Sequence, residues 1–244
     1  MIRYILVCFL LVLAMPFLAQ AQEMDFSSMS FDELKNFDNN SGNNTCKSYS
    51  EIFNRAKSDE KYYDLLKEKI TTNKQLYCYG IQGYALLTKL HPEDRQISER
   101  LGNALDCSHD KPYGQQKTSD NTNTLYAMIF VEPKLNLPYL SKLNECLISH
   151  GTYANREYAA HVVYHMANLA QDSLPYLKLA ITKPLLKPNY NARYYGHVCI
   201  AAAAAMRQLD AKSAADLFPT VKGDCKGLVN EPYNLLLDEV EATP

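Results

Sequence analysis

The sequence predicts an all-α fold, a right-handed alpha-solenoid of stacked antiparallel helical hairpins held together by disulfide bonds. Apolar residues recur at spacings of three and four along most of the chain, which is the pattern of amphipathic helices. Short sequences recur about 36 residues apart in the C-terminal half, and a period of this length is typical of repeated helical hairpins. The cysteines beyond the first 21 residues form an even set, as a disulfide framework requires.

The N-terminus has the three regions of a secretory signal peptide. A basic residue precedes an apolar run over residues 5–15, and Ala19 and Ala21 form the small-residue pattern of a cleavage site. We therefore expect residues 1–21 to be removed after export. The apolar run is too short to span a bilayer, and no later segment is long and apolar enough. The mature chain is expected to be soluble, not inserted in a membrane, and periplasmic or secreted.

The charge balance argues against one class of partner. The whole chain carries 25 basic and 27 acidic residues, a net charge of −2. Loss of the basic residue in the signal peptide makes the mature chain slightly more acidic. The sequence has no basic stripe of the kind that neutralises phosphates, so we expect no nucleic-acid partner.

The cysteines indicate how the hairpins are joined. In an oxidising compartment an even set of cysteines is typical of disulfides, and reduced, buried thiols are the alternative. No Cys-x-x-Cys pair occurs, which argues against a redox site or a zinc knuckle. Because only elements close in sequence touch in a solenoid, we expect neighbouring cysteines to pair. The predicted pairs are Cys46–Cys78, Cys107–Cys146 and Cys199–Cys225.

The first part of the mature chain gives weak signals. Residues 22–46 contain a weak helix pattern and a polar run, and we expect a flexible lead-in that only a bridge through Cys46 would fix. A single helical-repeat domain is predicted over residues 47–244. Its first part, residues 47–124, shows amphipathic helices without a clear repeat.

Three features interrupt this irregular part. Gly80 and Gly83 lie within one helix pattern and indicate either a close approach of two helices or a wrong helix assignment. His91-Pro92 ends that helix, and another is predicted over residues 94–107. The polar segment 108–123 is too long for an ordinary hairpin turn, and we expect either a binding loop or a disordered segment.

The repeat is clearest over residues 125–221. Each copy contains a proline that we place in the first turn of a helix, where its missing N–H costs little, and Ser173 is predicted to be the N-cap of the second copy. The recurring pieces are LPYL at Leu137 and at Leu174, a weaker LFPTV at Leu217, and YAAHV at Tyr158, which recurs as YYGHV at Tyr194.

One unit of this repeat carries a family signature. REYAA begins at Arg156, an apolar helix follows, and LPYL begins at Leu174. This order is similar to the HEAT repeat family, in which an Arg-x-x-Ala-like helix precedes a Leu-Pro-x-Leu helix. The resemblance covers about two and a half units over residues 125–221, and the alanine run 201–205 departs from it slightly. It implies a stack of helical hairpins, an architecture that more often binds than catalyses.

The helix predicted from residue 156 to 171 has an apolar and a polar face. The apolar face is expected to be core, and the repeat assigns the next hairpin's core by the same offset. Those residues are Ala159, Val162, Val163, Met166 and Ala170, then Tyr195, Val198, Cys199, Ala202 and Met206. The polar face is expected to be exposed and to bind a partner, together with tyrosines that have no predicted core role. The candidate partner-binding residues are Glu157, His161, His165, Asn168, Asp172, His197, Tyr113 and Tyr153.

Catalytic and metal-binding patterns are weak. His161 and His165 are four residues apart, with Glu157 one turn earlier and His197 in the next hairpin, a spacing that a zinc ion could use. The Glu beside the first His of a zinc hydrolase is missing, so we expect solvated side chains and no metal or cofactor. No Gly-x-Ser-x-Gly elbow or Gly-rich phosphate loop occurs. We therefore expect no catalytic residues and no enzyme.

These observations favour an exported, non-enzymatic protein that binds another protein. A small exported helical protein without a catalytic motif is similar in outline to immunity proteins that neutralise secreted antibacterial toxins. That likeness is one of size, compartment and composition, and it implies a single tight protein partner. One alternative is a scaffold or accessory subunit of an envelope assembly, and a second is a periplasmic hydrolase with an unrecognised site.

Overall fold

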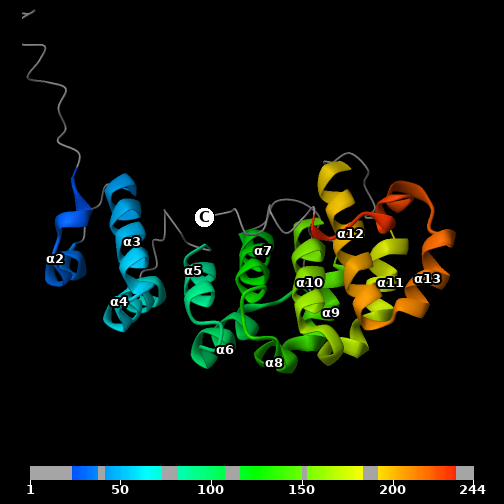
Figure 1. The fold of residues 1–244 in the computed structure, drawn as a ribbon, viewed down its shortest axis with the longest axis horizontal. Helices are drawn as coiled ribbons and strands as arrows, with labels where there is room; N and C mark the ends of the chain where they lie inside the picture. The colour runs from blue at the N-terminus through cyan, green and yellow to red at the C-terminus, as the bar shows by residue number, and fades with distance from the viewer. Residues whose placement is uncertain are drawn as a thin grey trace, which may run out of the picture. The chain divides into compact units, whose positions relative to one another are not determined.

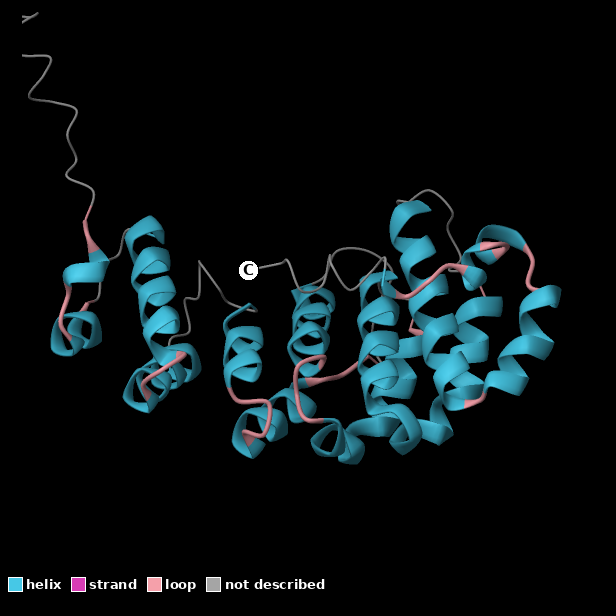
Figure 2. Ribbon diagram, in the orientation of Figure 1, coloured by secondary structure: helices cyan, strands magenta, loops and turns pink. Residues whose placement is uncertain are grey.

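The computed structural model describes residues 24–37, 42–72, 82–107, 116–149, 153–183 and 192–234 of the 244-residue chain. Every regular element in these ranges is a helix and none is a strand, which confirms the all-α class (Figure 1, Figure 2). No helix of the described ranges is long and apolar enough to cross a membrane. The internal contacts divide the chain into unit 1, up to Leu66, and unit 2, from Lys67 onward. The sequence-based prediction instead began the helical-repeat domain after residue 46.

Unit 1 is a short helical segment with its own small core. Its α2 begins with a capping box, in which Glu33 N donates to Ser30 Oγ and Ser30 N donates to Glu33 Oε2. Phe26 and Leu34 are buried, so part of the predicted lead-in contributes to this core. The elements are η2 (Phe26–Ser28), α2 (Phe31–Asn36), α3 (Gly42–Ala56) and the first part of α4 (Glu60–Thr72).

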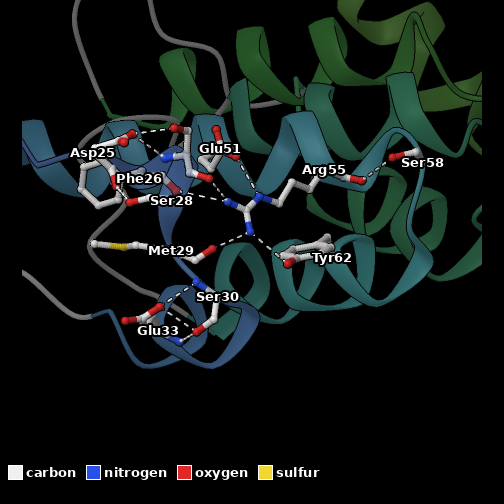
Figure 3. Close-up of polar contacts among 11 residues, drawn as sticks. Asp25, Phe26, Ser28, Met29, Ser30, Glu33, Glu51, Arg55, Ser58 and Tyr62 are labelled. Atoms are coloured by element: carbon white, nitrogen blue, oxygen red, sulfur yellow. Dashed lines mark hydrogen bonds and ion pairs between the residues drawn. The ribbon is translucent and has the colours of Figure 1, made fainter.

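Arg55 of α3 fixes the N-terminal segment (Figure 3). Its Nη1 donates to Met29 O at 2.7 Å, and its Nη2 donates to Ser27 O at 2.9 Å and Phe26 O at 3.2 Å. Its Nε pairs with Glu51 at 2.7 Å. The expectation that only a cysteine bridge would fix this segment is wrong, because a side chain of α3 holds three of its carbonyl groups.

Unit 2 consists of successive helices, and helices that are near one another in the sequence are in contact. α7 packs against α5 and α6, then α10 packs against α7 and α12, and α9 packs against α11. Figure 1 shows α5, α7, α10 and α12 next to one another in this order. The helices are α5 (Gln82–Leu90), α6 (Arg95–Ala104), α7 (Gln116–Met128), α8 (Pro133–Asn136), η3 (Leu137–Tyr139), α9 (Leu140–Ile148), α10 (Tyr153–Met166), η4 (Ala167–Ser173), α11 (Leu174–Thr182), α12 (Ala192–Leu209), α13 (Ala211–Leu217), η5 (Phe218–Thr220), η6 (Gly223–Cys225) and η7 (Leu228–Asn230).

The apolar core of unit 2 follows the predicted helix faces. All five residues predicted for the core face of α10 are buried, and α12 places its alanine run, residues 201–205, wholly in the interior. Small side chains allow α12 to pack against α10, α11 and α13 at once. The predicted core residues of α12 that are described, Val198, Cys199, Ala202 and Met206, are buried too, while the side chain of Tyr195 lies outside the described part.

The prolines of the three repeated pieces occupy equivalent places. Pro138 and Pro175, the prolines of the two LPYL copies, lie in the first turn of η3 and α11, which confirms their predicted position. Pro219 of LFPTV has the same place in η5. The predicted N-cap role of Ser173 is wrong. Ser173 has helical backbone angles, φ −81° and ψ −12°, and makes no capping bond, because the chain passes from η4 into α11 without leaving the helical region.

Two disulfides link elements of unit 2. Cys107, just after α6, is bonded to Cys146 of α9, and Cys199 of α12 is bonded to Cys225 of η6. Both pairs are those predicted by the nearest-neighbour argument. The third predicted pair cannot be followed in the same way, because Cys78 and the side chain of Cys46 lie outside the described residues.

A buried arginine donates hydrogen bonds to the ends of two helices. Arg156 of α10 is 2% exposed, and its Nε donates to Ser149 O at 2.8 Å, just after α9. Its Nη2 donates to Ile148 O at 3.2 Å, and its Nη1 donates to Lys183 O at 3.0 Å, just after α11. One side chain therefore satisfies carbonyl groups at the C-terminal ends of two helices, where helices leave such groups without a partner.

Two expectations from the irregular part have clear outcomes. A side chain at Gly83 would lie 3.2 Å from Ile70, so this glycine marks the close approach of α5 to α4. The expected polar loop is shorter than predicted, because α7 already begins at Gln116. Within that helix the buried Asn121 accepts from Asp106 N at 3.1 Å and donates to Asp106 O at 2.7 Å. Tertiary contacts thus override a polar composition that favours loops.

Candidate functional site

The predicted polar stripe of α10 divides into a buried and an exposed part. Glu157 is 6% exposed and His161 is wholly buried, so the expectation that these two face solvent or a partner is wrong. α12 and the segment around Tyr233 cover them, and no periodicity within one helix can reveal that cover. The exposed part is His165, Asn168 and Asp172.

The exposed part continues into an apolar side chain. Leu169 of η4 is 45% exposed, and Leu137 of η3 is 43% exposed. η3 and η4 each contact α8 and α9. Ala167, at the start of η4, has φ +48°, a left-handed conformation that strains a residue with a side chain. We name His165, Asn168, Leu169 and Asp172 the η4 surface.

The buried part forms a polar cluster between α10, α12 and the C-terminal segment. His197 Nδ1 lies 3.3 Å from Glu157 Oε1, and His161 Nε2 lies 3.8 Å from the same oxygen. His161 Nδ1 is hydrogen-bonded to the Tyr233 hydroxyl. The 36-residue offset in the sequence relates His161 to His197, and both lie close to the carboxylate of Glu157.

The surroundings shift the pKa of two members of this cluster, Glu157 and Tyr233. Burial by itself raises the pKa of Glu157, but its interactions with His161 and His197 outweigh it, so the pKa is lowered from its ordinary value. Burial, with the charges of Tyr164 and Glu157, raises the pKa of Tyr233. The Tyr233 hydroxyl is therefore neutral at physiological pH and is not a phenolate nucleophile.

The contacts of this cluster link the C-terminal segment to α10 and α12. His161 shares a hydrogen bond with the Tyr233 hydroxyl through Nδ1, while its Nε2 faces Glu157 Oε1 at 3.8 Å without forming a hydrogen bond. The result is a chain of contacts from the C-terminal segment through α10 to His197 of α12. His165 lies apart from it, exposed and edge-on to Tyr164. Among the described residues, no group of three His, Cys, Asp or Glu side chains is placed to hold a metal ion.

An open cavity of about 440 Å³ lies against the outer side of Tyr233. It is bounded by α10, α12 and the segment that follows η7. Tyr164 and Tyr233 form an aromatic wall, with ring centroids 4.0 Å apart. The residues that line the cavity are Tyr164, Ala204, Arg207, Gln208, Asn230, Glu231, Pro232 and Tyr233.

Arg207 supplies the positive charge of this cavity. Its Nη1 donates to Val229 O at 2.6 Å and its Nη2 donates to Glu231 O at 3.2 Å, which fixes the guanidinium. The guanidinium carbon lies 5.2 Å from the Phe218 ring centroid. Burial lowers the pKa of Arg207, although an arginine stays charged under all ordinary conditions. Within the described ranges no carboxylate forms an ion pair with Arg207.

Sequence reasoning missed Arg207, Tyr164 and Tyr233. The alanine run of α12 ends shortly before Arg207, a cation at the end of a buried helix, which is the one signal that could have found it. Of the two tyrosines selected from the sequence, Tyr153 is half-buried at the start of α10, and Tyr113 lies outside the described residues. Comparisons of this chain with models of protein families, with curated proteins and with solved structures found no match.

Proposed function

We propose that this protein is an exported, non-enzymatic binding protein, built as a right-handed HEAT-like solenoid, that acts in the bacterial periplasm. Within that class we propose an immunity protein that neutralises a secreted antibacterial toxin. The expected signal peptide, residues 1–21, gives the route of export. The two disulfides agree with an oxidising compartment.

The observation that carries the proposal is the η4 surface. A large apolar side chain, Leu169, stands nearly half exposed between polar neighbours. Ala167 holds the start of this segment in a strained conformation, which a protein keeps only where the surrounding structure enforces it. An apolar anchor with a polar rim on a rigid helical scaffold is the usual composition of a protein interface. Leu137 of η3, an element that contacts the same helices α8 and α9, is a second exposed leucine.

The stack of hairpins supports the same function. Contacts run from each hairpin to its neighbour in unit 2, and the disulfides and Arg156 join elements that are near in sequence. Such a scaffold is rigid, so a surface on it loses little conformational freedom on binding. The buried Glu157 and His161 stabilise this scaffold and are not themselves available to a partner.

The test compares two substitutions that each add one carboxylate. Leu169→Asp places it in the η4 surface, and Ala215→Asp places it on the exposed face of α13. The exported proteins are crosslinked in the native envelope, and copurifying proteins are identified by mass spectrometry. We expect Leu169→Asp to lower the affinity for the toxin about 30-fold, because an interface anchor contributes about 2 kcal/mol. Ala215→Asp should bind like the unchanged protein.

A deletion strain separates this function from that of an envelope scaffold. Loss of an immunity protein should sensitise cells to a rival or sister toxin and leave the envelope intact. A leaky envelope in the absence of any toxin would instead favour the scaffold. Equal toxin binding by the Leu169→Asp and Ala215→Asp proteins would remove the η4 surface from the proposal.

A further inference from the structure

We propose that the cavity beside Arg207 is a binding site for a small organic carboxylate. This site is separate from the η4 surface and does not depend on the protein-binding function. The cavity lies between α10, α12 and the segment after η7, and its volume of about 440 Å³ is in the range of small-molecule sites.

Arg207 supplies the recognition of the anion. The carbonyl groups of Val229 and Glu231 fix the guanidinium but use only part of its set of N–H donors. The Phe218 ring lies 5.2 Å from the guanidinium carbon, and Arg207 lines the cavity. A planar carboxylate matches the edge of a guanidinium with two parallel hydrogen bonds. Such a ligand also supplies the counter-charge that the partly buried cation lacks among the described residues.

The other walls favour an organic ligand over a bare inorganic anion. Tyr164 and Tyr233 present aromatic surface, and Ala204 adds a small apolar side chain between them and Arg207. The His161 hydrogen bond fixes the position of the Tyr233 ring, so the aromatic wall is already in place before a ligand enters. The cavity is also much larger than a phosphate or chloride ion needs.

Two lining residues determine how strongly the anion is held. Gln208 is an exposed amide at the rim, next to Arg207 in the chain. Glu231 also lines the cavity, and its carboxylate makes no ion pair with Arg207. An acidic residue in the wall opposes an anionic ligand, so the present sequence should bind less tightly than one with a neutral residue there.

The experiment is a titration of the full exported chain followed by NMR. The probes are benzoate, its neutral analogue benzamide, and inorganic phosphate. We expect benzoate to bind with a Kd on the order of 1 mM, as suits a ligand of this size, and to shift the ring signals of Tyr164 and Tyr233. Benzamide and phosphate should each bind at least about tenfold more weakly.

The variants leave Arg207 itself unchanged, because it also holds the segment after η7. Gln208→Glu places a carboxylate in the cavity and should weaken benzoate binding about tenfold, whereas Gln96→Glu, the same change at an exposed position of α6, should have no effect. Glu231→Gln should tighten it about twofold to fivefold. Equal affinity for benzamide, tighter binding of phosphate, an unchanged Gln208→Glu protein, or no saturable benzoate binding below about 20 mM would each overturn the assignment.

Discussion

Unit 1 and unit 2 each contain an arginine that bonds several backbone carbonyl groups, and the two arginines differ in their exposure to solvent. In each, one arginine collects backbone carbonyl groups and joins segments that are apart in the chain. Arg55 of unit 1 also bonds Glu51 and the Tyr62 hydroxyl, and its side chain is 21% exposed. Arg156 of unit 2 is almost completely buried.

We expect burial of the side chain to decide the energetic weight of such an arginine. Water reaches the partners of the partly exposed Arg55 and replaces part of what is lost when its side chain is removed. Arg156 is 2% exposed and its bond to Ser149 O is buried, so loss of its side chain leaves a buried carbonyl group without a donor. We therefore expect Arg156 to be the more important of the two for stability.

The largest expected effect is that of Arg156→Met. The substitution keeps an apolar stem but leaves the carbonyl groups of Ile148, Ser149 and Lys183 without their donor. We expect a loss of roughly 3–5 kcal/mol in the free energy of unfolding of unit 2. Hydrogen exchange of peptides from residues 153–183 measures it. A loss below about 1 kcal/mol would show that burial does not decide the weight of this arginine.

Removal of the Cys107–Cys146 disulfide should have the next largest effect. The bond joins residues 39 apart, and its loss, by changing both cysteines to Ala, should destabilise unit 2 by roughly 2–4 kcal/mol. Urea unfolding followed by hydrogen exchange reports each unit. The matched double variant at Cys199 and Cys225, 26 residues apart, should lose slightly less. A loss of equal size in residues 42–66 would contradict the assignment of this bond to unit 2 alone.

Arg55→Met should cost only about 1–2 kcal/mol, because the side chain is partly exposed to water. The effect should be local, with faster hydrogen exchange over residues 26–36, a segment that includes the three carbonyl groups bonded by Arg55. Arg55→Lys is the control variant, because it keeps the positive charge while its single ammonium group can donate to only some of these carbonyl groups. If Arg55→Met costs as much as Arg156→Met, the contrast between the two units fails.

The smallest expected effect has the opposite sign. Ala167→Gly removes the side chain from a residue at φ +48°, and the relief of strain should exceed the gain of freedom in the unfolded chain. We expect unit 2 to become more stable by about 0.5 kcal/mol. Ala215→Gly, in the regular helix α13, should instead destabilise it by about 1 kcal/mol. Urea midpoints give both values, and equal signs would show that Ala167 is unstrained.

Several features of the fold follow from short stretches of the sequence. The end of α5 before Pro92 and the proline turns of η3, α11 and η5 depend on local backbone chemistry alone. The core face of α10 depends on helical periodicity within one element. The pairs Cys107–Cys146 and Cys199–Cys225 follow because neighbouring hairpins touch.

Features that depend on a second element were predicted less well. Asn121 belongs to a helix because Asp106 offers it a donor and an acceptor, and the polar residues around it gave no sign of that partner. Ser173 precedes LPYL as an N-cap would, yet the chain before it is already helical. In the sequence, Arg207 resembles any other cation near the end of a helix. Its role depends on the carbonyl groups of Val229 and Glu231, which belong to a later segment of the chain.

The sequence by itself determined that this chain forms helices, where several of them begin and end, and which cysteines of unit 2 pair, because each of these depends on residues near one another in the chain. Only the tertiary structure decided that Glu157 and His161 are buried while His165 and Leu169 are exposed. All four lie on or beside the same helix. The difference arises because α12 and Tyr233 cover one end of α10. The apolar periodicity of a helix does not reveal which of its residues are buried by a segment that is distant in the sequence.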